Sequence, residues 1–105
     1  MARLDVYPMP GRRGESAPAG YVLDVQADLL SGLATRTVVP LLPRADAPPP
    51  IGELNPVFPI DGQDHVMLTQ AIASIPAREL RRRVTSLAAR HDEIGRALDI
   101  LLIGY

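Results

Sequence analysis

The sequence contains no cysteine and no tryptophan, and each of its 11 basic residues is an arginine. Without cysteine the chain has no disulfide framework and no thiol chemistry, which is typical of a reducing compartment. No apolar run approaches the roughly 20 residues that cross a bilayer, and the first residues do not resemble a signal peptide. We therefore expect a soluble, cytoplasmic protein without a membrane segment.

A strong net charge is also missing. The 11 basic residues are balanced by 12 acidic ones, so the net charge is -1 and gives no electrostatic reason for the chain to bind DNA by itself. Aromatic residues are scarce, with three tyrosines and one phenylalanine, so leucine, valine, isoleucine and alanine must fill the core. The length of 105 residues predicts a single domain over residues 1–105.

Short segments with alternating apolar and polar residues run through the first two thirds of the chain. They predict strands over 2–7, 21–27, 35–42, 55–60 and 65–69, with a shorter extended piece at 74–76. Alternation in the first of these predicts a strand buried on one face. Pro40 lacks an N–H and therefore predicts an edge strand or a bulge. Regularly spaced strands followed by one helix predict a mostly β fold, either a small barrel or two packed sheets, with a C-terminal helix.

Proline and glycine mark the connections. Residues 8–20 form a loop on composition, and 43–52 include a stiff run of three prolines. Asp61-Gly62 between apolar runs predicts a hairpin whose loop covers 61–64. A helical turn is expected near 70–73, and 78–84 fits either a strand edge or a solvated helix.

Residues 86–105 predict one amphipathic helix with Ser86 as its N-cap. Gly95 inside this helix costs about 1 kcal/mol relative to alanine, which predicts close packing at that position. The apolar stripe consists of Leu87, His91, Ile94, Leu98, Leu101 and Leu102.

The sequence ends in Leu101-Leu102-Ile103-Gly104-Tyr105, with no polar residue after the apolar ones. Most chain ends are polar and frayed, whereas an apolar end is stable only when something covers it. The cover could be the body of the protein, a second copy or a foreign partner. This ending predicts a protein that functions by docking and not by catalysis.

Motifs for catalysis, for nucleotide binding and for cofactor or metal binding are missing from the sequence. His91-Asp92-Glu93 groups three titratable residues, but neighbours in a helix fan out and do not converge. We interpret His65 as part of the hairpin, and Asp24 with Gln26 as a hydrogen-bonded structural pair. No catalytic residue, cofactor or metal site is therefore predicted.

Several of these stretches, taken together, resemble the CcdB family of plasmid-addiction toxins, which poison DNA gyrase. The segments 21–30 and 37–41 resemble the second and third strands of the family. The resemblance continues collinearly through Asn55-Pro56-Val57-Phe58-Pro59-Ile60, Asp61-Gly62, Met67, Thr69, Ala73-Ser74-Ile75-Pro76, Ser86-Leu87, His91, Glu93-Ile94 and Gly104.

The resemblance implies a CcdB/MazF-like fold with a five-stranded antiparallel sheet, a smaller three-stranded sheet and a C-terminal helix, assembled as a homodimer. It also implies a toxin of a type II toxin–antitoxin system for plasmid maintenance. Such a toxin inserts the paired helix ends into the A subunit of DNA gyrase and traps the cleaved DNA complex. It is a topoisomerase inhibitor and not an enzyme. A CcdA-like antitoxin with an acidic disordered segment neutralises it.

The residues implied for gyrase binding lie at the chain end and on an apolar pair after the second strand. Ile103 stands where the family has a tryptophan, so the flat ring used for a cation–π contact is missing. Gly104 retains close backbone approach, and Tyr105 could restore an aromatic surface. The implied gyrase contacts are Leu29, Leu30, Asp99, Leu102, Ile103, Gly104 and Tyr105, and the cations for the antitoxin are Arg12, Arg13, Arg44, Arg81, Arg82 and Arg83.

Two alternatives remain open. The fold also resembles that of MazF- and Kid-type endoribonucleases, for which Arg3, Arg36 and Asp24 are the candidate residues, although no motif matches. The other alternative is a domesticated, non-toxic relative that binds an antitoxin.

Overall fold

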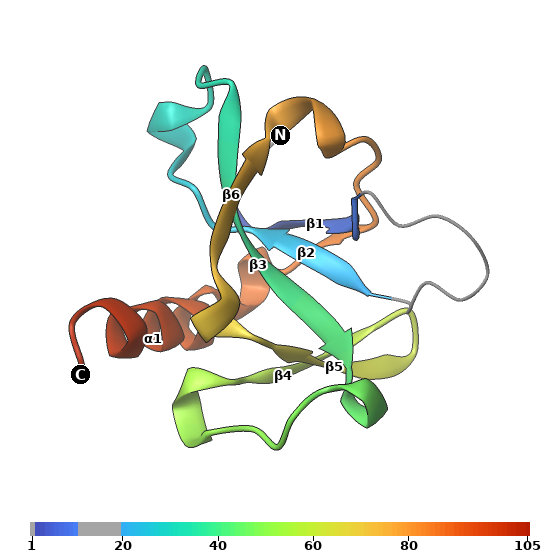
Figure 1. Cartoon of the computed structure of the whole chain (residues 1–105), viewed down its shortest axis with the longest axis vertical. Coiled ribbons are helices and arrows are strands. Elements are labelled where there is room, and N and C mark those ends of the chain that lie inside the picture. The colour runs from blue at the N-terminus through green and yellow to red at the C-terminus, as the bar shows by residue number, and fades with distance from the viewer. Residues whose placement is uncertain (1, 11–19) are drawn as a thin grey trace.

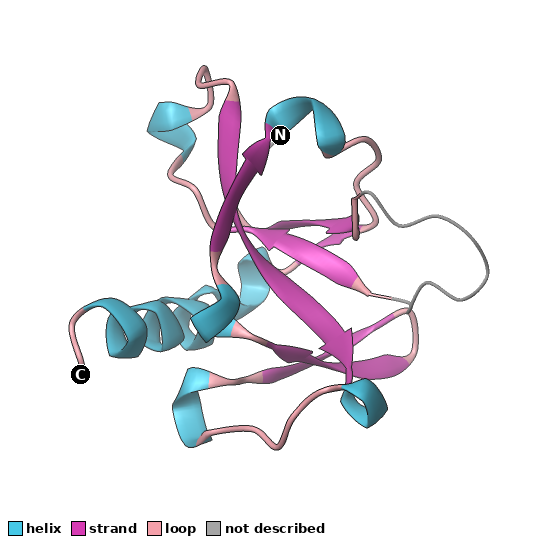
Figure 2. Ribbon diagram, viewed as in Figure 1, coloured by secondary structure: helices cyan, strands magenta, loops and turns pink. Residues whose placement is uncertain are grey.

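The computed structural model describes residues 2–10 and 20–105, in which an antiparallel sheet packs against one α-helix (Figures 1 and 2). The strands are β1 (Asp5–Pro8), β2 (Tyr21–Asp24), β3 (Thr35–Pro43), β4 (Val57–Ile60), β5 (Gln63–Met67), β6 (Ala73–Pro76) and β7 (Thr85–Ser86). The helix is α1 (His91–Leu102), and short 3-10 turns are η1 (Asp28–Leu30), η2 (Arg44–Asp46), η3 (Gly52–Leu54), η4 (Thr69–Ala71), η5 (Ala77–Glu79) and η6 (Ala88–Arg90). The predicted mostly β fold with a C-terminal helix is confirmed. Most of the loop predicted over 8–20 lies outside the described residues.

β3 is the longest strand and belongs to both parts of the sheet. The strand order is β4-β5-β3-β2-β1-β7, and β6 also pairs with β3. Residues 35–38 of β3 pair with β6, and residues 41–43 pair with β5. The strands β6-β3-β2-β1-β7 and β3-β5-β4 therefore form the five-stranded and three-stranded parts that the resemblance implies. Together they make a nearly closed, barrel-like sheet.

Pro40 lies inside β3, a central strand, so the predicted edge strand is wrong, although the pairing on one side of β3 is interrupted at this residue, as the alternative of a bulge implies. On one side Pro40 pairs in register with Val22 of β2. On the other side the pairing with β6 ends at Val38 and the pairing with β5 begins at Leu41. Between these two pairings Pro40 faces Leu68, the residue after β5, whose N–H donates to the Pro40 carbonyl at 2.9 Å. Pro40 therefore uses its carbonyl on that side, where a missing N–H breaks no strand pairing.

Both faces of β1 and β2 are buried, so the prediction of a half-buried first strand is wrong. One face carries the main core, which α1 covers with the fully buried Ile94 and Ala97. The other face carries a second core, in which Leu80 from the segment after η5 packs with three strand residues. The second core consists of Tyr7, Val22, Val38 and Leu80.

The helix is shorter than predicted, because Ser86 belongs to β7 and pairs with Asp5. The Ser86 hydroxyl accepts a hydrogen bond from the Ala88 N–H at 3.2 Å, at the start of η6, so Ser86 is not the N-cap of α1, whose N-cap position is Arg90. α1 begins at His91, which is exposed and does not lie on the apolar stripe. A Cβ on Gly95 would meet no atom within 4 Å, so the close packing predicted there is wrong.

The β4–β5 hairpin is tighter than predicted. Ile60 pairs with Gln63, which leaves a loop of the two residues Asp61 and Gly62. Both have positive φ, 53° and 80°, as in the type I′ turn that matches the twist of the flanking strands. The helical turn expected near 70–73 is η4, and the segment left open at 78–84 is η5 followed by irregular chain.

Candidate functional site

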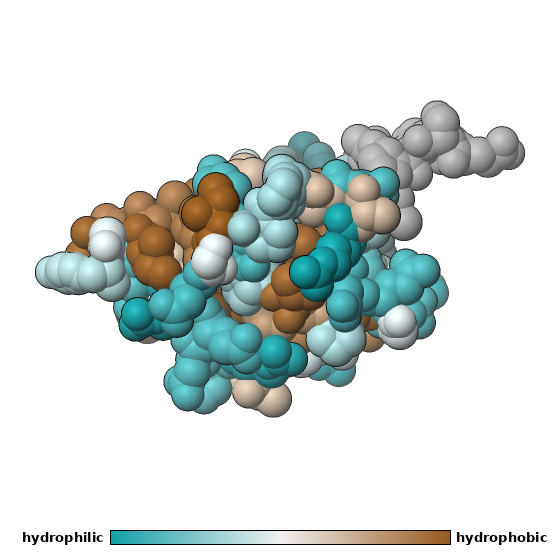
Figure 3. Space-filling model, turned by 90° about the horizontal axis from the view of Figure 1, so that it is seen from below, coloured by the Kyte–Doolittle hydropathy of each residue, from teal (hydrophilic) through white to brown (hydrophobic). Residues whose placement is uncertain are grey.

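The C-terminal end of α1 presents apolar side chains to solvent. Leu102, Ile103 and Tyr105 are 69%, 62% and 77% exposed. The preceding turn of the helix is half-buried through Leu98 and Leu101, of which Leu98 packs on the main core. Figure 3 shows the same pattern, since apolar surface gathers on the left, where α1 ends. The helix is therefore anchored along its length while its end remains uncovered by the described residues.

Gly104 ends the helix through its backbone conformation. Its φ is 101°, and its N–H donates to the Asp99 carbonyl at 3.0 Å, next to the bond from the Ile103 N–H at 2.8 Å. A left-handed glycine that closes a helix in this way is common, because other residues are strained there. A Cβ at this position would meet no atom within 4 Å. The requirement for glycine within the chain thus comes from φ, and Asp99 contributes through its main chain while its side chain is exposed.

The second predicted contact, the pair Leu29 and Leu30, lies on η1 between β2 and β3. Leu29 is 93% exposed and Leu30 is 47% exposed, and Leu33 nearby is 52% exposed. In Figure 1 this turn and the chain end both lie on the left of the molecule. The structure thus places the predicted residues in two exposed apolar patches, one on the helix end and one on the turn.

The predicted arginines fall into a described and an undescribed group. Arg81, Arg82 and Arg83 are exposed on the segment that covers the second core, and Arg83 lies 3.6 Å from the Asp5 carboxylate. Arg44 is exposed and lies 3.9 Å from the Asp64 carboxylate. Arg12 and Arg13 lie outside the described residues.

Two of the three candidate residues for RNA cleavage are not accessible to a substrate in this structure. Asp24 and Arg36 are fully buried, and the Asp24 Oδ2 atom accepts hydrogen bonds from the Arg36 Nε at 2.9 Å and Nη2 at 2.5 Å. Arg3 is half-buried and donates from its Nε to the Val25 carbonyl at 3.2 Å. Asp24 and Gln26 are both buried and hydrogen-bonded, but Asp24 Oδ1 accepts from the Gln26 main-chain N–H at 3.0 Å and not from its side-chain amide.

The two histidines also lack catalytic surroundings. His65 is buried, contacts the Gln63 carbonyl through Nδ1 at 2.8 Å and packs edge-on against Tyr21. His91 is exposed and its Nδ1 lies 3.1 Å from the Asp92 carboxylate. The described residues contain no cluster of acidic residues and histidines that could hold a metal ion. No helix in the described ranges combines the length and apolar character that a bilayer span requires.

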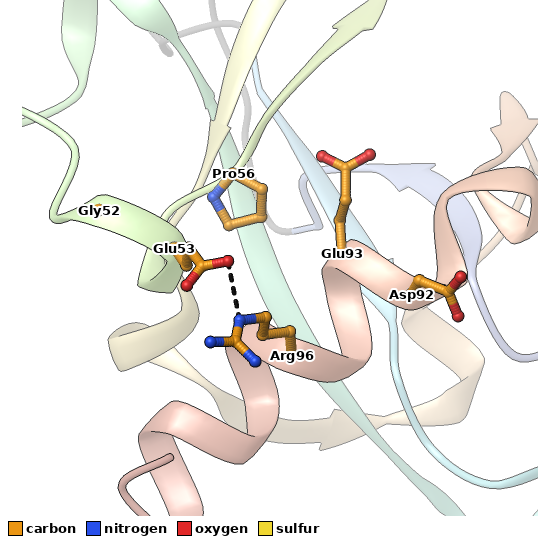
Figure 4. Close-up of a pocket in the computed structure, with 6 residues that line it drawn as sticks. All are labelled: Gly52, Glu53, Pro56, Asp92, Glu93 and Arg96. Carbon is orange, nitrogen blue, oxygen red and sulfur yellow. Dashed lines mark hydrogen bonds and ion pairs between the residues drawn. The ribbon is translucent and has the colours of Figure 1, made fainter.

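An open cavity of about 390 Å³ lies between η3 and α1 (Figure 4). Its charged lining groups are paired. Arg96 donates to the Glu53 carboxylate at 2.7 Å, and Arg90 donates to the Glu93 carboxylate at 2.6 Å, which lowers the pKa of Glu93. Arg90 also lies 4.8 Å above the Phe58 ring. The contacts of Arg90 and Arg96 tie the start of α1 to the sheet and to η3. The cavity is lined by Gly52, Glu53, Pro56, Asp92, Glu93 and Arg96.

Gln26 lies in the site region and has a role that the sequence did not reveal. Its buried side chain bridges η1 and β3 through hydrogen bonds to the Leu30 carbonyl and the Thr37 N–H. Gln26 lies two residues after Asp24 and three residues before Leu29. A polar residue at this place, between a strand and an exposed turn, is the sequence feature that could have indicated that it bridges the two.

Comparison with known proteins gives one family and one well-matched fold. No curated protein sequence matches the chain. The structure is similar to that of an endoribonuclease in complex with its cognate antitoxin from a mycobacterial species. The TM-score is 0.75, the identity is 20%, and the alignment covers 97% of this chain and 94% of that one. At this identity the likeness shows the fold alone. The family model for CcdB protein matches residues 3–104, so the chain belongs to the CcdB family.

Proposed function

We propose that this protein is the toxin of a toxin–antitoxin system, and that it acts by binding the A subunit of DNA gyrase and trapping the cleaved DNA complex. Membership of the CcdB family supports the toxin assignment. The observation that carries the gyrase assignment is the exposed apolar end of α1, with Leu102, Ile103 and Tyr105 at least 62% exposed. Burying an exposed apolar side chain such as Leu or Ile contributes roughly 1.5–3 kcal/mol, so this end supplies part of the binding free energy of a docking surface.

The proposed mechanism requires no reaction by the toxin itself. Asp24 and Arg36, two of the candidate residues for RNA cleavage, are buried and form an ion pair with each other. The described residues offer no metal site. The helix end supplies shape and apolar surface, and binding energy alone holds the target in one state. Ile103 in place of an aromatic ring makes this contact depend on apolar burial and not on a cation–π contact.

The test compares two isoleucines of matched exposure. Ile103 is 62% exposed at the helix end, and Ile51 is 61% exposed in the connector before β4. Ile103→Ser is expected to weaken gyrase inhibition about tenfold or more, because it removes apolar contact area at the centre of the proposed interface. Ile51→Ser is the control and should inhibit like the wild type. The measurement is supercoiling and DNA cleavage by purified gyrase from the same host.

Four results would overturn the proposal. One is the absence of a trapped cleavage complex at micromolar wild-type protein. Another is equal inhibition by the Ile103→Ser variant. The third is fragmentation of RNA by the purified protein, which would assign it to the endoribonuclease class instead. A protein that causes no growth arrest when expressed without antitoxin would be the non-toxic relative.

The proposed antitoxin partner is an acidic segment that binds the exposed arginines. Arg81, Arg82 and Arg83 form a short run of positive charge on the cover of the second core. The similar endoribonuclease structure is a complex with its cognate antitoxin, which supports an antitoxin as the partner. Replacing all three arginines with serine should weaken antitoxin binding at low salt while gyrase inhibition persists; unchanged affinity would refute this site.

A further inference from the structure

The turn η1 holds an apolar side chain in water. Leu29 is 93% exposed, although a leucine gains free energy from burial. Within the turn, the Leu30 N–H donates to the Ala27 carbonyl at 2.9 Å and the Ser31 N–H donates to the Asp28 carbonyl at 3.0 Å. A single 3-10 turn has poor hydrogen-bond geometry and little stability of its own. Its conformation must therefore be fixed from outside.

Gln26 supplies this outside support. Its side chain is buried, and its Nε2 donates to the Leu30 carbonyl at 3.0 Å. Its Oε1 accepts a hydrogen bond from the Thr37 N–H of β3 at 2.9 Å. One amide therefore joins the turn to the central strand, and both ends of the amide are in use.

The buried ion pair holds Gln26 in turn. The Gln26 N–H donates to the Asp24 Oδ1, while the Asp24 Oδ2 accepts from Arg36 on β3. Both charged side chains are fully buried, and the Arg36 Nη1 has no hydrogen-bond partner among the described residues. Such a pair is weak evidence for stability, because desolvation offsets much of the attraction. The Asp24–Arg36 pair orients the segment from Asp24 to Gln26, which leads into η1.

A second tether acts on the other side of the turn. The Asp28 Oδ1 accepts a hydrogen bond from the Arg3 N–H at 2.7 Å, and Arg3 is also bonded to the Val25 carbonyl. The turn is thus held at its first residue by the chain before β1 and at its last residue by Gln26.

We propose that Gln26, oriented by Asp24 and Arg36, is a positioning residue that fixes η1 so that Leu29 and Leu30 are preorganised for a macromolecular partner. The identity of the partner as gyrase rests on the proposed function. Preorganisation raises affinity because the ordering of the loop is complete before binding. Gln26 itself need not touch the partner.

The experiment separates local positioning from general stability. Gln26→Met removes both side-chain hydrogen bonds at similar volume, and Gln26→Glu keeps the acceptor for Thr37 but cannot donate to Leu30 when ionised. Gln63→Met, at an exposed position in β5, is the matched control. Hydrogen exchange is measured for the turn amides of Leu30, Ser31 and Leu33 and for the strand amides of Leu23 and Val39. Gyrase affinity is measured with the same proteins.

In both Gln26 variants the turn amides are expected to exchange about three- to tenfold faster, as for the loss of one hydrogen bond, while the strand amides keep their rates. Gyrase affinity should fall by a similar factor, and the control should match the wild type. Unchanged turn exchange, equal acceleration of strand and turn amides, or faster turn exchange with unchanged affinity would each overturn the proposal. If the wild type binds no gyrase, the proposed function fails, and the exchange data alone then decide whether Gln26 fixes the turn.

Discussion

Tyr7 illustrates how burial of the second face changes a single residue. It belongs to the second core beneath Leu80 and lies near several charges. Burial raises the pKa of Tyr7 above its ordinary value, and the carboxylates of Asp5 and Asp24 raise it further. Arg36 and Arg83 lower this pKa and offset part of the shift. The folded state therefore favours the neutral phenol.

This shift predicts alkaline sensitivity. A group whose pKa is raised on folding contributes stability that is complete below its unfolded pKa, near 10 for tyrosine, and is lost as the pH rises further. The free energy of unfolding of the wild type should fall more steeply above pH 10 than that of Tyr7→Phe, as measured by urea denaturation. Tyr105→Phe, at an exposed position, should follow the wild type. Parallel curves for all three proteins would contradict the prediction.

The residue types in the sequence predicted the exposed apolar end of the helix, but they did not predict the partners of the buried polar groups. Leu102 and Ile103 could be assigned to the surface because the apolar residues of the helix continue to the end of the sequence, where the chain has little left to cover them. The partner of Asp24 could not be predicted, because Arg36 is distant in sequence and resembles a solvent-facing residue of an alternating strand. Ser86 resembles a helix cap in the sequence, but its backbone pairs with β1 instead.

At the scale of elements, the Asp24–Arg36 pair links β2 and β3 across the second face. The two strands are adjacent in the sheet, and Asp24 pairs in register with Val38. Removing one partner of such a pair leaves a buried charge, whereas removing both leaves an apolar site.

We therefore predict a strong non-additivity between the two positions. Arg36→Met should lower the free energy of unfolding by about 3–5 kcal/mol, because it leaves Asp24 charged and buried. The double variant Asp24→Leu with Arg36→Met should recover part of this loss, since the second core is already apolar but the Gln26 N–H loses its acceptor on Asp24. Chemical denaturation of the single and double variants measures the coupling. A double variant as unstable as Arg36→Met would show that the pair itself stabilises the sheet.

The element types followed from alternation and turn residues, and the sizes of the two sheets from the family resemblance, but the strand boundaries depended on tertiary contacts. The Asp-Gly turn could be located, whereas its two-residue length depends on the register of Ile60 with Gln63. The burial of both faces of β1 could not be predicted, because the cover comes from the irregular segment around Leu80, whose sequence has no clear period.

For the whole molecule, the exposed helix end and η1 predict self-association. A homodimer that sets the helix ends of two chains side by side would cover part of this apolar surface around Leu102, which a single chain leaves in water, and would leave Ile103 and Tyr105 available to a further partner.

If the folded state is a dimer, its stability depends on concentration. A hundredfold rise in protein concentration should stabilise the dimer by about 2.7 kcal/mol and raise the thermal midpoint. Differential scanning calorimetry at several concentrations measures this, with sedimentation to count the chains. Leu102→Asp should abolish the dependence. A midpoint independent of concentration in the wild type, with one chain in sedimentation, would contradict the prediction.

The margins of the sheet limit where such association can occur. β4 and β6 have four residues each and β7 has two, and prolines interrupt two of them, Pro59 in β4 and Pro76 at the end of β6. Short, proline-bearing margins are poor templates for adding a further strand. A protein with solvent-exposed leucines can aggregate into fibres if its edge strands also pair with those of other copies. The edge strands offer few consecutive unpaired N–H and C=O groups. Association between copies should therefore be limited to contacts that saturate, and the free protein should not form extended aggregates.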